Sequence, residues 1–448
     1  MSKIYIILMP PIDDTFRDIL QSLGIATLNE MQIQAIEAQR NNRDILLLSP
    51  TGSGKTLAFL LPLLEKLSSD KKEIQALILT PSRELALQIE SVFRSLRSSY
   101  RVVCCYGGHD IQVEERSLVY PPALLIGTPG RLLDHIDRQT IDLKEVHTII
   151  LDEFDKSLEF GFIEDMREIF ACLHGIRQRI LTSATSAVEI PVFVGIKSPH
   201  AINFLEKTPL GKLEIKTVYS GDPDKLTTLY RLLGELNGSP TLIFCNYREH
   251  AERISTYLRK QAVENEFFHG GLEQAERERV LCKFRNGSTT ILISTDLAAR
   301  GLDIPEIEYI IHYHFPDTEE AFIHRNGRTA RMKASGTAFV LIGESEIFPA
   351  YLPEIPEVYR LSGKNKIPPK PEWNTLYIGK GKKDKLSKMD IVGFLCQKGN
   401  LHKEEIGRIE IKDFHAFAAI KRNRIRKTLS LIRNEKIKNM KTKFAISF

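Results

Sequence analysis

A short stretch rich in glycine, serine and threonine, Ser49 to Thr56, follows directly on the apolar run Ile45 to Leu48. It fits the phosphate-binding pattern G-x-x-x-x-G-K-[ST] at every fixed position except the first, where Ser49 replaces glycine. Glycines let the backbone turn so that its N–H groups point at phosphate oxygens, and the following helix adds the positive end of its dipole. A chance turn that contains lysine would not also have a strand before it and a helix after it. The stretch therefore predicts a nucleoside triphosphate site, with contacts at Thr51, Gly52, Ser53, Gly54, Lys55 and Thr56.

Two adjacent carboxylates, Asp152 and Glu153, follow a second apolar run, Thr148 to Leu151. Such a pair suits magnesium chemistry, because one carboxylate holds the ion through water and the other accepts a proton from an attacking water. Acidic pairs after strands are also common without any catalytic role. Combined with the phosphate-binding stretch, the pair predicts that Asp152 and Thr56 hold Mg²⁺ and that Glu153 is the general base. Lys55 is expected at the β- and γ-phosphates.

Short apolar runs that are typical of β-strands recur along the chain and alternate with helical patterns. They are residues 45–48, 76–79, 102–105, 123–126, 148–151 and 179–181 in the first half, and 241–244, 266–268, 290–293, 309–312 and 337–341 in the second. Unbroken apolar strands between helices predict an α/β fold with parallel sheets that are covered on both faces. Ligands of such sheets bind at the carboxyl ends of the strands, where the polar motifs of this chain lie. The motif-free region from Leu205 to Lys225 is expected to divide two such units.

The C-terminal part of the chain differs in composition from the rest. The proline-rich stretch 349–375 predicts a stiff, extended connector, and Leu376 to Phe448 has the length of one small α/β domain. This last segment contains 19 Lys and Arg against 7 Asp and Glu, whereas the remainder contains 43 against 50. A basic domain on a mildly acidic body favours a polyanionic partner, although a merely solvated charged face is the alternative. Its expected element order (strand, basic loop, helix, two strands, basic helix, strand) fits an RNA-recognition fold.

The remaining composition is that of an ordinary globular protein. The six cysteines show no C-x-x-C spacing, which predicts reduced thiols in a cytoplasmic protein and no metal site. His269, His312 and His314 lack a ligand spacing pattern and are expected to be structural or to face RNA. The N-terminal apolar stretch Ile4 to Met9 is too short for a signal sequence or a membrane span.

The motifs between about residues 20 and 345 resemble, in their order, those of the DEAD-box RNA helicases. The name-giving motif is LDEFD, Leu151 to Asp155, in which Phe154 stands where the family has alanine. We expect packing to accommodate Phe154. The resemblance implies two RecA-like domains, RNA-stimulated ATP hydrolysis and local separation of RNA strands. The glutamine motif of the family matches Gln32, which implies adenine recognition.

Further matches imply where RNA binds and how hydrolysis is coupled to strand separation. In the first unit, PSRELA, a glycine pair and TPGR imply RNA contacts, because glycines allow close approach to phosphates and arginines supply charge. These implied contacts are Pro81, Arg83, Gly108, Thr128 and Arg131. The SAT motif implies that Ser183 and Thr185, with Asp155, form the coupling element. In the second unit the implied RNA contacts are Phe244, Gln274, Arg277, Thr295 and Arg300.

The second unit has no phosphate-binding stretch, so it is expected to complete the site of the first. HRNGRTAR, His324 to Arg331, matches the arginine-finger motif of the family, which implies that Arg328 and Arg331 reach the γ-phosphate. A fixed guanidinium offsets the charge that develops in phosphoryl transfer, an effect of roughly 10³ to 10⁵ in rate. Without the resemblance, a basic surface loop or a structural ion-pair cluster would be equally reasonable. Asn326 and Ala330 replace the usual Ile and Gly. The motif STDLAARGLD implies nucleotide contacts at Gly301 and Asp303.

The tail resembles the C-terminal domain of the DbpA-type helicases in the strings GKKDKL and DIVGFL and in the segment Ile406 to Ile420. In that subgroup the domain anchors the enzyme to large-subunit ribosomal RNA. A dimerisation domain or a purely stabilising one is the alternative. The residues expected to contact RNA are Lys382, Lys383, Lys385, Arg422, Arg424 and Arg426.

The sequence thus predicts a monomeric, cytoplasmic RNA helicase that uses ATP and Mg²⁺ and acts on large-subunit ribosomal RNA or pre-ribosomal particles, without membrane contact. The expected domains are RecA-like units at 1–205 and 206–348, a connector at 349–375 and an RRM-like domain at 376–448. Two rival functions stay open. One is a nucleotide-gated RNA clamp without productive unwinding. The other is a DNA translocase of the same superfamily, against which the PSRELA and HRNGRTAR matches argue.

Overall fold

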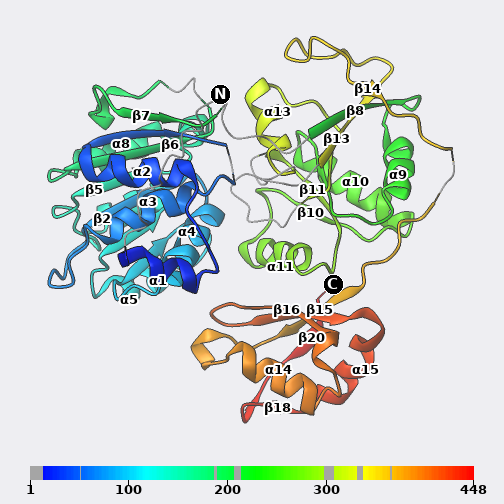
Figure 1. Cartoon of the computed structure of the whole chain (residues 1–448). Helices are drawn as coiled ribbons and strands as arrows, with labels where there is room; N and C mark the ends of the chain where they lie inside the picture. Colours follow the sequence, from blue (N-terminus) through cyan, green and yellow to red (C-terminus); the bar gives the residue numbers. More distant parts are fainter. Residues whose placement is uncertain are drawn as a thin grey trace, which may run out of the picture. The chain divides into compact units, whose positions relative to one another are not determined.

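The computed structural model describes residues 14–50, 52–185, 189–205, 213–296, 307–329, 336–363 and 366–447 (Figure 1). The predicted site residues Thr51, Arg300, Gly301, Asp303 and Arg331, and the departure Ala330, lie outside these ranges. The chain forms two compact units, Met1–Pro209 and Leu210–Phe448. Among the helices that the structure describes, none is long and apolar enough to cross a membrane.

The first unit, called the first sheet domain, contains a parallel sheet of seven described strands in the order β3-β4-β2-β5-β6-β1-β7. The strands are β1 (Asp44–Leu48), β2 (Ala76–Leu79), β3 (Val102–Cys105), β4 (Leu124–Gly127), β5 (Thr148–Leu151), β6 (Gln178–Ser183) and β7 (His200–Asn203). The helices are α1 (Asp14–Ser22), α2 (Glu30–Asn41), α3 (Lys55–Leu64), α4 (Arg83–Ser95), α5 (Ile111–Leu118), α6 (Pro129–Asp137), α7 (Phe154–Glu159), α8 (Ile163–Ala171) and the 3-10 turn η1 (Val192–Val194).

Alternation of side chains along the strands explains why this sheet is covered on both faces. On β2, Ala76 and Ile78 belong to one buried cluster with α2, α3 and α4, while Leu77 and Leu79 belong to another with α6, α7 and α8. Successive side chains of a strand point to opposite faces, so an unbroken apolar run feeds two cores. Figure 1 shows the helices on either side of the sheet.

The second unit begins with a second sheet domain, whose seven described strands are also parallel and have the order β10-β11-β9-β12-β13-β8-β14. The strands are β8 (Leu213–Ser220), β9 (Thr241–Phe244), β10 (Glu266–Phe268), β11 (Ile291–Ser294), β12 (Tyr309–His312), β13 (Gly336–Gly343) and β14 (Glu357–Val358). The described helices are α9 (Leu226–Glu235), α10 (Arg248–Lys260), α11 (Gln274–Arg285) and α13 (Glu319–Asn326).

The same unit ends in a tail domain with an antiparallel sheet, whose strand order is β16-β17-β15-β20. Helices α14 and α15 cover one face, where a core forms around Leu376, Ile391 and Ile425. The elements are β15 (Trp373–Ile378), η2 (Lys382–Asp384), α14 (Lys388–Gln397), η3 (Lys403–Glu405), β16 (Ile406–Ile411), β17 (Ala416–Lys421), α15 (Arg422–Ile432), β18 (Lys436–Ile437), β19 (Met440–Lys441) and β20 (Phe444–Ile446). This is the element order that the sequence predicts for an RNA-recognition fold.

The structure contains every strand predicted from an apolar run; it adds β7, β8 and β14 in the sheet domains and the two-stranded β18-β19 sheet in the tail domain. The region 205–225 was expected only to divide two units, but it contains β8, which pairs with β13 along eight residues. Within the predicted proline-rich connector, Glu357 and Val358 form β14, which pairs with β8. The tail domain starts at Trp373, three residues before its predicted start. All six cysteines lie within the described residues and are free thiols.

Candidate nucleotide and RNA sites

Three neighbouring strands of the first sheet domain, β5, β6 and β1, carry the nucleotide motifs at their carboxyl ends. The phosphate-binding stretch follows β1, the acidic motif follows β5 and the SAT motif follows the end of β6. Parallel strands bring these ends to one edge, and Ser49 N donates to Ser183 O at 3.0 Å across it. Ser49 and Ser183, which are 134 residues apart in sequence (183 − 49), therefore meet at one place.

The phosphate-binding stretch requires glycine at two described positions. Gly52 has φ +84° and Gly54 has φ +91°, which is a backbone region that residues other than glycine rarely adopt. Gly54 also has no room for a side chain, because a Cβ would lie 2.5 Å from Gln32 Nε2. Gln32 Nε2 donates to Gly54 O at 3.2 Å, and Asn29 Nδ2 donates to Ser53 O at 3.0 Å. The predicted adenine contact Gln32 thus also supports the loop that should hold the phosphates.

Polar groups of the same stretch fit a phosphate ligand. Lys55 begins α3 and is 8% exposed, and its Nζ donates to the carbonyl oxygens of Ser49 and Pro50. Ser53 Oγ is buried and has no hydrogen-bond partner among the described residues. Buried hydroxyls in folded proteins nearly always have a partner, and a phosphate oxygen would supply one.

The two carboxylates that are predicted to hold Mg²⁺ and to act as general base differ in environment. Asp152 is buried and accepts a hydrogen bond from Thr182 Oγ1, whereas Glu153 begins the turn into α7 at φ +48°. Burial raises the pKa of Asp152, and the Thr182 hydrogen bond and the Lys55 charge oppose that effect. A divalent cation would stabilise such a buried carboxylate. The left-handed backbone conformation of Glu153 is strained for any residue other than glycine. Such strained residues are common at active sites.

The end of the acidic motif contacts the SAT motif. Thr185 Oγ1 donates to Asp155 Oδ2 at 3.3 Å, and Ser183 Oγ donates to Thr185 O at 2.8 Å. The three predicted coupling residues are therefore linked. Phe154, the departure from the family motif, is 0% exposed within the core cluster of α6, α7 and α8. The prediction that packing accommodates Phe154 is confirmed.

The other half of the same sheet edge, formed by β2, β4 and β3, carries the first set of predicted RNA contacts. Arg83 begins α4 after β2, Thr128 caps α6 after β4, and Gly108 follows β3. Gly108 has φ +99°, and a Cβ there would lie 2.1 Å from Arg83 Nη1. Arg131 Nη2 donates to His109 O at 2.9 Å. Two arginines from different motifs, Arg83 and Arg131, thus contact the same glycine turn. Arginine side chains and backbone N–H groups commonly donate hydrogen bonds to nucleic-acid phosphates, so this arrangement suits RNA.

In the second sheet domain, the arginine-finger segment is fixed on both sides of Arg328. Arg325 is 1% exposed, and its guanidinium binds Asp296 Oδ1 at 2.6 Å and Asp296 Oδ2 at 2.7 Å. Asn326 Oδ1 accepts from His312 Nε2 at 2.9 Å, and Thr329 Oγ1 donates to Ile307 O. Arg328 itself is 4% exposed. The sequence groups Arg325 with the finger arginines, but its contacts make it a structural ion-pair residue.

Of the other described residues that are predicted to contact RNA in the second sheet domain, Phe244, Arg277 and Thr295 are buried, and Gln274 is partly exposed. Phe244 is 2% exposed in the core, and Arg325 lies 5.1 Å from its ring centre. Arg277 lies 4.7 Å from the Phe268 ring centre. Gln274 Nε2 donates to Glu278 at 3.1 Å, and Thr295 is 6% exposed.

Comparison with known proteins agrees with this geometry. Residues 29–191 match the DEAD/DEAH box helicase family, residues 224–333 match the helicase conserved C-terminal domain, and residues 375–445 match the DbpA RNA binding domain. The ATP-dependent RNA helicase DbpA of Escherichia coli is 31% identical over 432 residues, which cover 94% of each chain. This chain belongs to the DEAD-box ATP-dependent RNA helicases. Accordingly, it couples RNA binding to ATP hydrolysis.

Other relatives of this DEAD-box helicase match a smaller part of its chain. The helicase CshA of Bacillus cereus is 33% identical over 340 residues, which cover 75% of this chain and 65% of CshA. Two solved structures share the fold: S. cerevisiae Dbp5 bound to RNA and ADP BeF3 and Mss116p bound to ssRNA and AMP-PNP. The Dbp5 structure has a TM-score of 0.66 and 24% sequence identity, and the match covers 75% of this chain and 88% of the Dbp5 chain. The Mss116p structure has a TM-score of 0.68 and 23% sequence identity, and the match covers 78% of each chain.

The predicted tail contacts of this DEAD-box helicase fall into two groups. Lys382, Lys383, Lys385 and Arg426 are exposed. Arg422, in contrast, forms a bidentate ion pair with Glu264 of the second sheet domain, at 2.9 and 2.6 Å. Arg424 binds Asn400 O at 2.8 Å and Glu405 at 2.9 Å. Arg422 therefore contributes to holding the tail domain on the second sheet domain.

A second contact covers part of the tail sheet. Thr375 on β15 is 1% exposed, and its Oγ1 contacts Asn286 Nδ2 and Ser288 Oγ, each at 2.9 Å. Both partners belong to the turn after α11. This sheet face carries the stacking aromatics of many RNA-recognition folds. The exposed basic loops of the tail are consequently the better candidates for RNA contact in this helicase.

Proposed function

We propose that this DEAD-box helicase acts as a cytoplasmic monomer that remodels large-subunit ribosomal RNA during ribosome assembly. The observation that carries the proposal is the tail: a basic domain with its own core, whose residues 375–445 match the DbpA RNA binding domain. A separate domain of this kind concentrates the helicase on one RNA, while the two sheet domains act on neighbouring duplex without regard to sequence.

The nucleotide site would work through its own charges and hydrogen-bond donors. Lys55 meets the β- and γ-phosphates, and Ser53 Oγ supplies a donor that otherwise has no described partner. Thr56 and Asp152 would hold Mg²⁺, which offsets phosphate charge. Glu153 takes the proton of the attacking water. Arg328 and Arg331 supply the charge that stabilises the transition state, and Gly301 and Asp303 contact the nucleotide.

RNA phosphates would bind the carboxyl ends of β2, β3 and β4, where Arg83, Gly108 and Arg131 meet. Arginine and backbone N–H groups position phosphates without reading sequence, which suits an enzyme that acts on many duplexes. Pro81 and Thr128 complete this surface. Thr295 and Arg300 form its counterpart in the second sheet domain, with Gln274 and Arg277 beside them.

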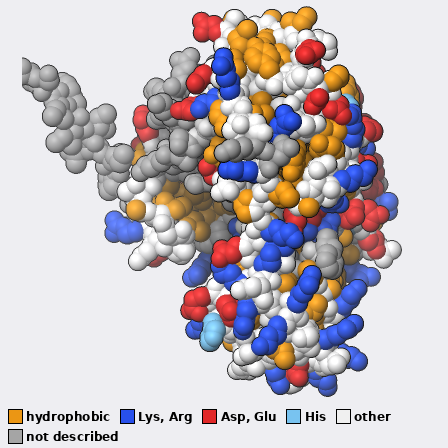
Figure 2. All heavy atoms as spheres, turned by 90° about the vertical axis from the view of Figure 1, so that its right-hand side faces the viewer, with side chains coloured by type: hydrophobic (Ala, Val, Ile, Leu, Met, Phe, Trp, Pro, Cys, Tyr) orange, Lys and Arg blue, Asp and Glu red, His pale blue; other side chains and the backbone are white. Residues whose placement is uncertain are grey.

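The tail would bind RNA through the loop that contains Lys382, Lys383 and Lys385. Phe414 is 59% exposed at the neighbouring hairpin, and Lys383 Nζ lies 4.3 Å from its ring centre. An exposed ring among lysines suits an unstacked base and the phosphates next to it. Figure 2 shows Lys and Arg side chains gathered over the tail domain.

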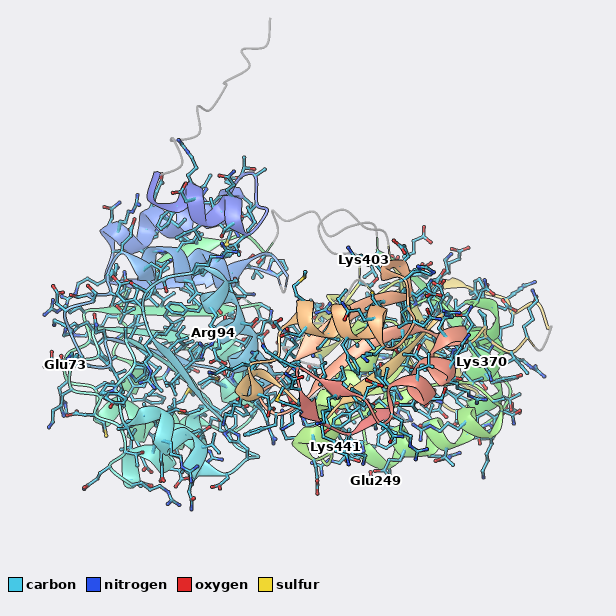
Figure 3. All side chains as sticks on the ribbon, turned by 90° about the horizontal axis from the view of Figure 1, so that it is seen from below. Glu73, Arg94, Glu249, Lys370, Lys403 and Lys441 are labelled. Atoms are coloured by element: carbon cyan, nitrogen blue, oxygen red, sulfur yellow. The ribbon has the colours of Figure 1, made fainter. Side chains whose placement is uncertain are left out.

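A charge-matched comparison tests the ribosomal part of the proposal. One variant replaces Lys382, Lys383 and Lys385 by glutamine; the control replaces Lys403, Lys427 and Lys441, which are exposed lysines elsewhere on the same domain. Lys403 and Lys441 are labelled in Figure 3. Binding of a large-subunit ribosomal RNA fragment and of an unrelated hairpin is measured at two salt concentrations.

We expect the first variant to lose its preference for the ribosomal fragment and to show a flatter salt dependence, because it loses phosphate contacts, and we expect the control to keep both properties of the parent. Equal loss in both variants would reduce the tail to a general basic anchor. A strand-displacement assay beside an ATPase assay separates a helicase from a clamp that hydrolyses ATP without unwinding. Stimulation of the ATPase by DNA as strong as by RNA would instead favour a DNA translocase.

A further inference from the structure

A buried carboxylate lies beneath the RNA-binding half of the sheet edge. Glu114 on α5 is 3% exposed, and its Oε1 accepts from Tyr106 N at 2.9 Å and lies 3.0 Å from His109 Nε2. Its Oε2 lies 2.7 Å from His135 Nε2 and 3.7 Å from Arg131 Nε. Neither the sequence motifs nor the family comparison assigns a role to Glu114.

These partners come from two segments that contain predicted RNA contacts. Tyr106 and His109 flank the glycine pair Gly107-Gly108, and Arg131 and His135 are on α6. Arg131 also donates to His109 O at 2.9 Å, which closes the connection between the two segments. Glu114 is therefore the shared acceptor that joins the loop after β3 to the start of α6.

The charge of Glu114 is maintained by these contacts. Burial alone would raise the pKa of Glu114, but hydrogen bonds from His109, His135 and the Tyr106 N–H outweigh it and lower the pKa to about 2. His135 is 0% exposed, and its Nδ1 lies 2.7 Å from Thr140 Oγ1, so the ring is held at both nitrogens. A charged acceptor forms stronger hydrogen bonds than a neutral one.

Cys105, Glu114 and His135 also have ligand atoms within 4.8 Å of one another, a spacing that a metal site would share. Direct hydrogen bonding explains the geometry better. The atoms of Glu114 and His135 are 2.7 Å apart, whereas two ligands of a tetrahedral zinc ion are about 3.3 Å apart. Burial and the Glu114 charge raise the pKa of the Cys105 thiol, while metals bind the thiolate.

We propose that Glu114 is a positioning residue for RNA binding, which fixes Gly108 and Arg131 so that both face the same stretch of RNA backbone. The inference rests on the proposed RNA contacts of the first sheet domain. Loss of the carboxylate would leave Gly108 and Arg131 themselves unchanged, but it would no longer fix their positions relative to each other. The concentration of RNA needed for stimulation should then rise, while the hydrolytic site at the other half of the edge keeps its structure.

The test compares Glu114→Gln with Glu115→Gln, a neighbour on the same helix whose substitution removes the same charge. RNA-stimulated ATPase is measured in the full chain against RNA concentration, together with thermal unfolding. In Glu114 the two carboxylate oxygens accept separately, Oε1 from His109 and Oε2 from His135. Glutamine has an NH₂ donor in place of one of these oxygens, so it can accept at only one of the two positions. We expect the KM for RNA to rise about tenfold in Glu114→Gln with kcat changed less than twofold, and no change in Glu115→Gln.

His109→Asn is a milder second variant, since it removes one arm of the network, and a smaller rise in the KM for RNA is expected. If both variants fold and keep the parental KM for RNA, the inference is wrong. A stoichiometric bound metal in the parent protein would also overturn it. Arg131→Ala separates the two proposals: if it too leaves the KM unchanged, the RNA contacts themselves are wrong. If Arg131→Ala raises the KM and the Glu114 variant does not, only the positioning role fails.

Discussion

His312 makes the stability of the second unit depend on pH. Its ring is 0% exposed, and Nε2 bonds to Asn326 Oδ1 at 2.9 Å, beside the arginine-finger segment. Burial, reinforced by the Arg325 charge, lowers the pKa of His312 from 6.5 to about 3. As the pH falls through 6.5, the unfolded chain therefore takes up a proton that the folded domain refuses until about pH 3. The stabilisation from keeping this ring neutral is complete above pH 6.5 and is lost progressively below it.

The size of the effect follows from proton linkage. Each proton bound only by the unfolded state lowers the free energy of unfolding by about 1.4 kcal/mol per pH unit. Between about pH 7.5 and pH 5.5, one group with an unfolded-state pKa near 6.5 contributes about 1.4 kcal/mol in total. His312→Asn removes this titration while keeping a side chain that can bond Asn326. The variant should therefore lose about 1.4 kcal/mol less stability than the parent over this pH interval.

Urea unfolding followed by tryptophan fluorescence measures this difference. The single tryptophan, Trp373, lies where the tail domain meets the second sheet domain, since a Cβ at Gly287 would be 3.4 Å from its ring. It therefore reports on the second unit. The control is His402→Asn, which changes an exposed histidine of the same unit and should behave as the parent does. An equal pH dependence in the parent and in His312→Asn would refute the reasoning.

Three further predictions concern the ATP site. Lys55→Ala should abolish ATP hydrolysis, because the phosphates lose their main side-chain counterion; turnover near the parental rate would contradict the site assignment. Glu153→Gln should still bind ATP and RNA but release RNA slowly, because the geometry survives while the base is lost; release at the parental rate would exclude Glu153 as the base. Arg328→Ala and Arg331→Ala should bind ATP almost normally but lose roughly 10³-fold or more in turnover. Weak ATP binding with unchanged turnover would argue against their role as fingers.

Most of the fold could be predicted because the interior strands are unbroken apolar runs with polar motifs at their carboxyl ends. The strands that were missed lie at or beside sheet edges. In β7 only Ile202 of the four residues is buried, and β8 mixes exposed and buried positions, as in Tyr219 and Val218. Edge strands bury less of their surface, so their sequences have a weaker apolar signal.

The site residues could be predicted where a motif fixes both residue type and spacing, as around Lys55 and Asp152. The supporting residues could not, because their partners are distant in sequence. Glu114 is one acidic residue in an amphipathic helix, and no local pattern links it to His135. Asn326 looks like a simple departure from the family motif until the structure pairs it with His312 on another element. For Arg325 the structural alternative that the sequence left open is the one observed, because its guanidinium pairs with Asp296.

The most direct test of the proposed function is RNA-stimulated ATPase of the full chain, measured with intact large-subunit ribosomal RNA and with an unrelated RNA of similar length at matched salt. Because the tail should hold the helicase on its target, ribosomal RNA is expected to give half-maximal stimulation at a concentration at least about tenfold lower. The difference should persist as salt is raised, since non-specific phosphate contacts weaken for both RNAs together. Equal stimulation by both RNAs at every salt concentration would contradict the ribosomal assignment and leave a DEAD-box helicase without a preferred RNA.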